Sequence, residues 1–271
     1  MLKKILKIAL FGILSLLISA CSDKESTATN VEVKKTVIKV GATPVPHVEI
    51  LEIVKPLLKA KGYDLEIIEF TDYVTPNIAL DEGELDANFF QHVPYLEQFN
   101  KNKHTSLVKT VNVHLEPMAI YSKSIKNLSE LKDGDIIAVP NDPTNESRAL
   151  DILVKEGLLT FKDVEFKTVI DIISNPKNLK IKELDAPQLA RVLDEVAAAI
   201  INTNYALSAN LNPIKDALVI ESKDSPYANV IAVKKGNESK DYIKALNEAI
   251  NSPEVKAFIR EKYNGSIVEA F

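Results

Sequence analysis

The sequence contains a single cysteine, so no disulfide can form within one chain, and stability must come from packing. It also lacks a glycine-rich phosphate loop and the G-x-S-x-G and H-E-x-x-H motifs, which excludes the sites that those motifs build. Acidic residues outnumber basic ones by 38 to 33, which argues against nucleic acid or an anionic membrane face as the main partner. With 46% hydrophobic and 26% charged residues, the composition is that of an ordinary globular protein.

The first 21 residues follow the pattern of a bacterial lipoprotein signal. Three lysines precede an apolar run at residues 8–18, which is too short for a spanning helix, and small residues stand directly before Cys21. We therefore predict that residues 1–20 are cleaved as a signal peptide and that Cys21 becomes the acylated first residue, rather than a buried free thiol. The lipid would then hold the protein at the cell membrane, facing the periplasm or the exterior.

Residues 21–35 have the composition of a tether. They are rich in Ser, Thr, Asn, Asp, Glu and Lys and have no apolar periodicity. Cleavage of the peptide removes three lysines and no acid, which leaves 30 of the 33 basic residues against 38 acidic ones, a balance of −8. The remaining chain of roughly 235 residues is long enough for one large domain or two lobes.

From residue 36 onward, short β-branched runs alternate with helical stretches, which predicts an α/β fold with mostly parallel sheets flanked by helices. A polar connection at 127–134 indicates a second unit. We predict two lobes, 36–122 plus 223–271 and 123–222, with ligand in the cleft between them, because ligands gather at the carboxyl ends of parallel strands. The predicted strands are 37–40, 65–70, 86–90, 107–113, 118–121, 136–139, 166–169, 179–184, 196–201, 217–221 and 229–233, and the predicted helices are 47–61, 76–85, one near Pro94, 143–156, 186–193, 239–250 and 253–263.

The segment at 139–148 is the richest in unusual polar residues, and here a predicted strand runs into a helix N-terminus. Unpaired backbone N–H groups and the positive end of the helix dipole favour a carboxylate or phosphate at this point. Arg148, one turn into the helix, can supply a bidentate pair to a carboxylate. The alternative is an Asn or Thr cap plus a surface arginine paired with a glutamate, and spacing alone does not separate the two.

Two further groups of residues lie at predicted strand ends. Tyr73, Phe90 and His92 can form the wall of a slot, with the Tyr and His tips free to hydrogen-bond, although an aromatic core with a satisfied histidine has the same pattern. The amides of Asn202 and Asn229 can accept from an ammonium and donate to a carboxylate, although Asn residues are also common turn formers.

Two other classes of function stay open on the residues alone. His47, His92 and His114 can supply a three-histidine zinc site with a carboxylate as fourth ligand, which would make the protein a metal receptor. An extracytoplasmic enzyme would need a nucleophile or an acid/base pair in the cleft, and His92 is the candidate for that role.

Long motifs along the whole mature chain resemble those of the methionine-binding lipoproteins of the NlpA family. They accompany the lipoprotein signal at Cys21 and follow the family's order. The motifs are G-A-T-P-V-P-H at 41–47, F-T-D-Y-V-T-P-N at 70–77, D-A-N-F-F-Q-H-V-P-Y-L at 86–96, V-P-N-D-P-T-N-E-S-R-A-L at 139–150, I-N-T-N-Y at 201–205 and S-P-Y-A-N at 225–229, together with the stretches at 175–180 and 183–189.

The resemblance implies a two-lobed periplasmic-type binding protein without enzymatic activity or cofactor, which acts as a monomer. Its ligand would be L-methionine, or in some relatives D-methionine or a methionine-containing dipeptide. The ligand would be delivered to an ABC importer made of a permease and an ATPase. The residues that the resemblance assigns to the ligand are Tyr73, Phe90 and His92 around the thioether, Asn145 and Arg148 at the α-carboxylate, and Asn202 and Asn229 at the other backbone groups.

Overall fold

The computed structural model describes residues 36–222 and 225–271 of the chain. The predicted signal peptide at 1–20, the tether at 21–35 and the lipidation residue Cys21 lie outside the described residues, so these stay predictions. Among the helices of the described part, none is both long enough and apolar enough to cross a lipid bilayer.

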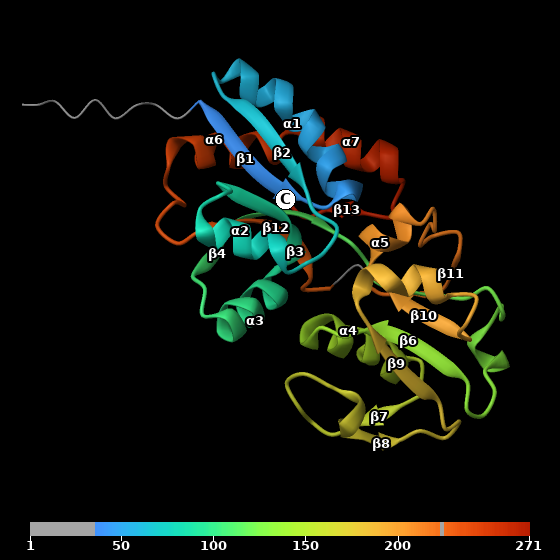
Figure 1. Cartoon of the computed structure of the whole chain (residues 1–271). Helices are drawn as coiled ribbons and strands as arrows, with labels where there is room; N and C mark the ends of the chain where they lie inside the picture. The colour runs from blue at the N-terminus through green and yellow to red at the C-terminus, as the bar shows by residue number, and fades with distance from the viewer. Residues whose placement is uncertain (1–35, 223–224) are drawn as a thin grey trace, which may run out of the picture. The chain divides into compact units, whose positions relative to one another are not determined.

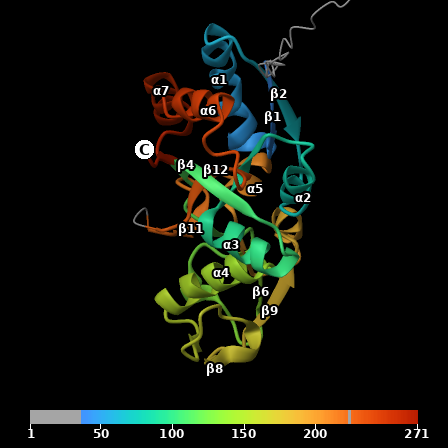
Figure 2. The ribbon, with the colours of Figure 1, turned by 90° about the vertical axis from the view of Figure 1, so that its left-hand side faces the viewer.

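The first lobe is built on a six-stranded sheet with the strand order β13-β4-β12-β3-β1-β2 (Figure 1). Helices α1, α6 and α7 pack their apolar side chains on one face of this sheet, and α2 and α3 cover the other face (Figure 2). The elements are β1 (Val37–Ala42), α1 (Glu49–Ala60), β2 (Asp64–Glu69), α2 (Thr75–Glu82), β3 (Ala87–His92), α3 (Val93–Lys103), β4 (Leu107–Leu115), β12 (Ala228–Lys234), α6 (Asp241–Ile250), α7 (Pro253–Tyr263) and β13 (Val268–Glu269).

The second lobe is built on a five-stranded sheet with the order β11-β5-β10-β6-β9. Helix α4 packs on one face, and a 3-10 helix at Ala186–Val192 and α5 cover the other. A two-stranded hairpin is attached to this lobe. The elements are β5 (Ala119–Tyr121), β6 (Ile136–Pro140), α4 (Pro143–Lys155), β7 (Thr160–Phe161), β8 (Ile172–Ser174), β9 (Lys180–Leu184), β10 (Ala198–Ile201), α5 (Thr203–Ser208) and β11 (Ala217–Ile220), with 3-10 turns at Leu128–Glu130 and Val169–Asp171.

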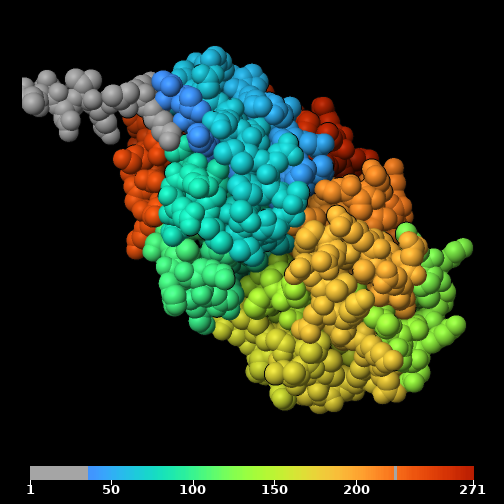
Figure 3. All heavy atoms as spheres, in the orientation of Figure 1, coloured from blue at the N-terminus to red at the C-terminus, as the bar shows by residue number. Residues whose placement is uncertain are grey.

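The chain passes twice between the two lobes. It leaves the first sheet after β4 through residues 116–118, here called the outgoing crossover. It returns from β11 to β12 through a segment whose described residues, 221–222 and 225–227, are here called the return crossover. In Figure 3 the blue to teal segments and the red C-terminal segment therefore share the first lobe, whereas yellow-green, yellow and light orange segments form the second. Strand β5 pairs with β10 and β11, which places it in the second sheet, although the predicted boundary at residue 122 places it in the first lobe.

The two-lobed α/β fold agrees with the sequence-based prediction, but the expectation of mostly parallel sheets is wrong. Strand β1 runs parallel to β2 and β3, and β6 runs parallel to β9 and β10. Strands β12 and β5 run antiparallel to their neighbours in the first and second sheets. Each of these two strands enters its sheet directly from the other lobe instead of through a helix, so nothing forces it into the parallel direction.

Two predicted elements differ in the second lobe. Residues 166–169 form no strand, and the extended pairing lies on either side of them, in β7 and β8. The predicted helix at 186–193 is a 3-10 helix, Ala186–Val192. In the first lobe, α1 begins at Glu49, two residues later than predicted, after a short helical turn at Pro44–Val48.

Candidate ligand-binding site

A pocket lies between the two lobes, and about 20 Å³ of it is open to the centre of a water-sized sphere. Side chains of the two lobes therefore nearly fill the pocket in this structure, with room for about one water molecule. The first lobe contributes residues from the ends of β2, β3 and the start of β12, and the second lobe contributes the start of α4 and the end of β10. The lining residues are the seven predicted ones, Tyr73, Phe90, His92, Asn145, Arg148, Asn202 and Asn229, together with Gln91, Tyr95, Glu116, Thr203 and Asn204.

Helix α4 presents Asn145 and Arg148 to the pocket from its first two turns. Its N-cap is Asp142, whose carboxylate accepts from the backbone N–H of Asn145 at 3.0 Å, and Pro143 follows directly. A proline is well tolerated there, because the first helical N–H has no intrahelical partner. The cap is therefore an aspartate, whereas the alternative to a ligand site expected an Asn or Thr cap. The helix start itself was predicted correctly.

Arg148 is 3% exposed, so the alternative of a surface arginine is wrong. Its partner is Glu221 in the return crossover: Nε donates to the two carboxylate oxygens at 3.0 and 3.1 Å, and Nη2 donates to Oε2 as well. Nη2 also donates to the main-chain oxygen of Glu116 at 2.8 Å, and the ring of Tyr227 stacks 4.3 Å from the guanidinium carbon. These contacts fix the guanidinium at the edge of the pocket.

An amide and imidazole network joins the lobes beside Arg148. His92 caps α3 by accepting from the backbone N–H of Tyr95 at its Nδ1, so its proton resides on Nε2, which donates to Asn145 Oδ1 at 3.1 Å. Burial, assisted by the charge of Arg148, lowers the pKa of His92 to about 3, so the ring is neutral. Asn202 Nδ2 donates to the same Asn145 oxygen at 2.9 Å. The Asn145 side chain is thereby held by both lobes.

The other end of the pocket is a group of aromatic rings. The ring of Tyr73 lies with its centroid 5.8 Å from that of Phe90, 5.9 Å from Tyr95 and 5.0 Å from Tyr205. Its hydroxyl donates across the lobes to Asn204 Oδ1 at 2.6 Å. The expectation of an aromatic slot and the alternative of an aromatic core both describe part of this arrangement, since the rings pack on one another and also line the cavity.

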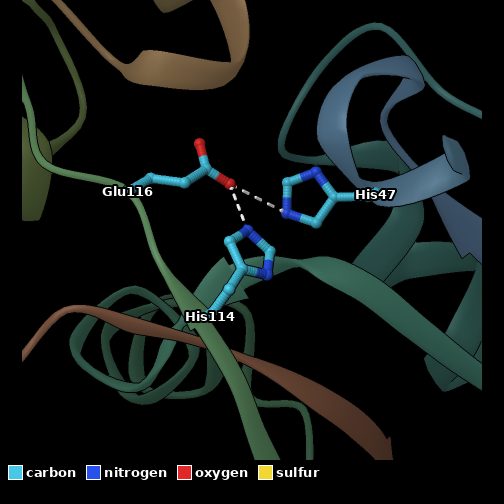
Figure 4. Close-up of side chains that lie close together, drawn as sticks. All are labelled: His47, His114 and Glu116. Atoms are coloured by element: carbon cyan, nitrogen blue, oxygen red, sulfur yellow. Dashed lines mark hydrogen bonds and ion pairs between the residues drawn. The ribbon is translucent and has the colours of Figure 1, made fainter. Parts of the chain in front are cut away.

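His47, His114 and Glu116 form a buried group, here called the His-Glu cluster (Figure 4). Glu116 Oε1 lies 2.7 Å from His114 Nε2 and 3.2 Å from His47 Nε2. Burial lowers the pKa of His114 to about 3 and that of His47 to about 4, so both rings are neutral. His92 is engaged with Asn145 and Tyr95 instead, so the alternative of a site with three histidines is not formed in the described residues.

Sequence reasoning missed the two glutamates of the site, Glu116 and Glu221. Each directly follows an apolar strand and begins a crossover, β4 in the first case and β11 in the second. A carboxylate at the end of an apolar strand is a usable signal, because it enters a region where burial needs a partner. Arg148 and His47 are distant in sequence from these glutamates, whereas His114, the closer partner of Glu116, lies two residues before it.

The comparisons with known proteins agree with this architecture. The NlpA lipoprotein model matches residues 38–271. The D-methionine-binding lipoprotein MetQ of Escherichia coli (strain K12) is 45% identical over 239 residues, which cover 86% of this chain and 88% of that protein. Outer membrane lipoprotein 3 of Mannheimia haemolytica is 43% identical over 272 residues, 99% of this chain and 100% of that protein.

A solved structure of a relative has the same fold. The nutrient binding protein from Burkholderia cenocepacia, whose structure is bound to methionine, superimposes with a TM-score of 0.85 at 48% identity. The match covers 86% of this chain and all of that one. The family model, the identities and the shared two-lobed fold lead to one conclusion: this chain belongs to the NlpA lipoprotein family.

Proposed function

We propose that this protein is the substrate-binding component of an ABC importer, and that it captures methionine between its two lobes and hands it on unchanged. The observation that carries the proposal is the division of the pocket into two ends. Arg148 and the amides lie at one end, and the rings of Tyr73, Phe90 and Tyr95 lie at the other. The names and bound ligand of the relatives support methionine as the molecule that this division fits.

The polar end suits the α-carboxylate. The Nη1 group of Arg148 makes no hydrogen bond within the described chain, so it remains available as a charge-assisted donor. The amide oxygen of Asn229 is engaged by His47 at 3.2 Å, which leaves its NH₂ group as a second donor. The rings at the opposite end suit a thioether, because sulfur makes favourable contacts with ring edges.

We further propose that Cys21 carries the lipid anchor and that the folded part works outside the cytoplasmic membrane beside a permease and its ATPase. Membership in a lipoprotein family supports the anchor. Closure of the lobes would bury the ligand and present one joined surface to the permease. The protein would act as a monomer.

We infer binding without catalysis from the state of the histidine in the pocket. An acid/base catalyst needs a pKa near the working pH and a free nitrogen facing the ligand. The pKa of His92 is lowered to about 3, and both of its ring nitrogens are engaged. Incubation with methionine should therefore return the amino acid unaltered.

Calorimetry on the full chain with L-methionine, D-methionine and norleucine tests the proposal. Norleucine has methylene in place of sulfur, so methionine should bind more tightly by roughly 2- to 12-fold, the range of a sulfur–aromatic contact. Phe90→Leu should weaken methionine binding and narrow this preference. Phe99→Leu is the matched control, since Phe99 is equally buried in the same ring cluster but does not line the pocket. Absence of binding by both methionine enantiomers would refute the proposal.

A further inference from the structure

Glu116 is a buried carboxylate that borders the pocket and has no role in the assignment above. It begins the outgoing crossover, and its side chain is 7% exposed. The Nε2 atoms of His47 and His114 both lie next to Oε1, and Figure 4 shows the second oxygen pointing away from both rings. A buried carboxylate costs free energy unless its charge is compensated, so the second oxygen of Glu116 requires a partner.

Hydrogen bonding explains the two histidines better than metal coordination does. His114 Nδ1 is buried and has no partner among the described residues, so the ring proton resides on Nε2 and is donated to Glu116. A metal held by both Nε2 atoms would move that proton to Nδ1, where no acceptor receives it, although metal-bound histidines normally donate their second N–H. His47 accepts from Thr43 Oγ1 at Nδ1, at 2.7 Å, so its proton resides on Nε2, which lies 3.2 Å from both Asn229 Oδ1 and Glu116 Oε1.

The donors to Glu116 are therefore neutral. Burial raises the pKa of its carboxyl group, and the interactions with His47, Arg148 and the backbone N–H of Asn204 oppose this effect. Arg148 directs its hydrogen bonds to Glu221 and to the main-chain oxygen of Glu116, not to the Glu116 carboxylate. Inside a closed pocket, the Glu116 carboxylate thus lacks a directly bonded cation within the described chain.

A second acceptor faces the pocket from the other lobe. The Oδ1 atom of Asn202 is buried without a hydrogen-bond partner among the described residues, while its Nδ2 donates to Asn145 at 2.9 Å. Asn202 is 7% exposed and lines the same cavity as Glu116. A buried acceptor without a hydrogen-bond donor destabilises the protein until a donor binds to it.

We propose that Glu116 and Asn202 Oδ1 form a subsite for the α-ammonium group of the ligand, so that the pocket accepts amino acids with a free, protonated α-amine and rejects acylated ones. His47 and His114 are positioning residues that hold the Glu116 carboxylate in place. The subsite rests on the proposed function, because it assigns the third anchor of the same ligand. It predicts that peptides with methionine behind a peptide bond bind poorly, since that nitrogen is an uncharged amide.

The test compares L-methionine with N-acetyl-L-methionine and with 4-(methylthio)butanoate, which keeps the carboxylate and thioether but lacks nitrogen. On the unmodified full chain, each analogue should bind roughly 10- to 150-fold more weakly than methionine, the range of a charge-assisted hydrogen bond. Glu116→Gln should weaken the binding of methionine by a similar factor and leave the binding of 4-(methylthio)butanoate unchanged. Most of the difference in affinity between the two ligands should then disappear. Glu146→Gln is the matched control, because Glu146 is 4% exposed and lies outside the lining residues.

Each outcome decides the matter. Equal affinity of the unmodified protein for methionine and its acetylated form would overturn the subsite, and so would Glu116→Gln weakening all three ligands by the same factor. Zinc that co-purifies with the protein, and whose removal abolishes binding, would show a metal site instead. If Glu116→Gln does not fold, the affinities of the unmodified protein for the three ligands still test the subsite. Failure of methionine itself to bind would refute the proposed function rather than the subsite alone.

Discussion

Replacement of Arg148 by methionine separates two roles of one side chain. The change keeps the length of the residue but removes its donors, so the ligand carboxylate loses a charge-assisted bond worth about 1.5–3 kcal/mol. Affinity for methionine should fall roughly 10- to 150-fold in calorimetry. The same change leaves Glu221, whose side chain is 13% exposed, without its cation, and breaking such a buried pair costs about 3–5 kcal/mol of unfolding free energy.

The double variant Arg148→Met with Glu221→Gln distinguishes the two effects. It removes both charges, so urea unfolding should recover most of the stability, whereas methionine affinity should stay as low as in the single variant. A glutamine at this position can still accept from the backbone N–H of Met118, which lies 3.1 Å from Glu221 Oε2. Wild-type affinity in either variant would remove Arg148 from the site. A double variant no more stable than the single one would show that the pairing does not stabilise the fold.

Two further predictions concern the inter-lobe contacts. Tyr73→Phe removes the 2.6 Å hydrogen bond to Asn204 but keeps the ring, so the free energy of methionine binding should weaken by about 0.5–1.5 kcal/mol. An unchanged dissociation constant would show that this bond does not contribute to closure of the lobes. The pKa of His92 is about 3 in the folded protein and 6.5 in the unfolded chain. The contribution of this residue to the free energy of unfolding is therefore fully present above pH 6.5, and below it falls by about 1.4 kcal/mol per pH unit. His92→Gln should reduce the slope in urea titrations between pH 6 and pH 4 by this amount, while His47 and His114, whose pKa values burial also lowers, still contribute theirs. The exposed His104, replaced by Gln, serves as the control.

The strand and helix periodicities carry most of the information on the fold. Helix α4 was predicted well because Pro143 marks its start and an apolar face follows within a few residues. The direction of β12 was not predictable, since it depends on the lobe from which the strand arrives. Residues 166–169 include the apolar Phe166 and Val169 but have no partner strand among the described residues, and pairing decides whether an extended segment becomes a strand.

The binding site, like the fold, was predictable from the sequence only in part. The seven predicted ligand residues all reach one pocket, because each lies near one end of a strand or in the first two turns of a helix. What the sequence did not contain is the hydrogen-bonding state of these side chains. Asn145 uses its NH₂ group on Asp142, and its oxygen on His92 and Asn202, so in this structure it organises the neighbouring groups. Its assignment to the α-carboxylate stays a prediction.

Because Arg148 is held by an acid of its own chain, the guanidinium does not have to be frozen when a ligand arrives. A free arginine side chain loses rotamer entropy worth about 2 kcal/mol on being fixed, and here folding has already met that cost. Departure of the ligand likewise leaves the side chain in its working rotamer. For a carrier that fills and empties many times, as proposed, every cycle therefore starts from a preorganised side chain, whose Nε and Nη2 stay on Glu221 while Nη1 makes no hydrogen bond within the described residues.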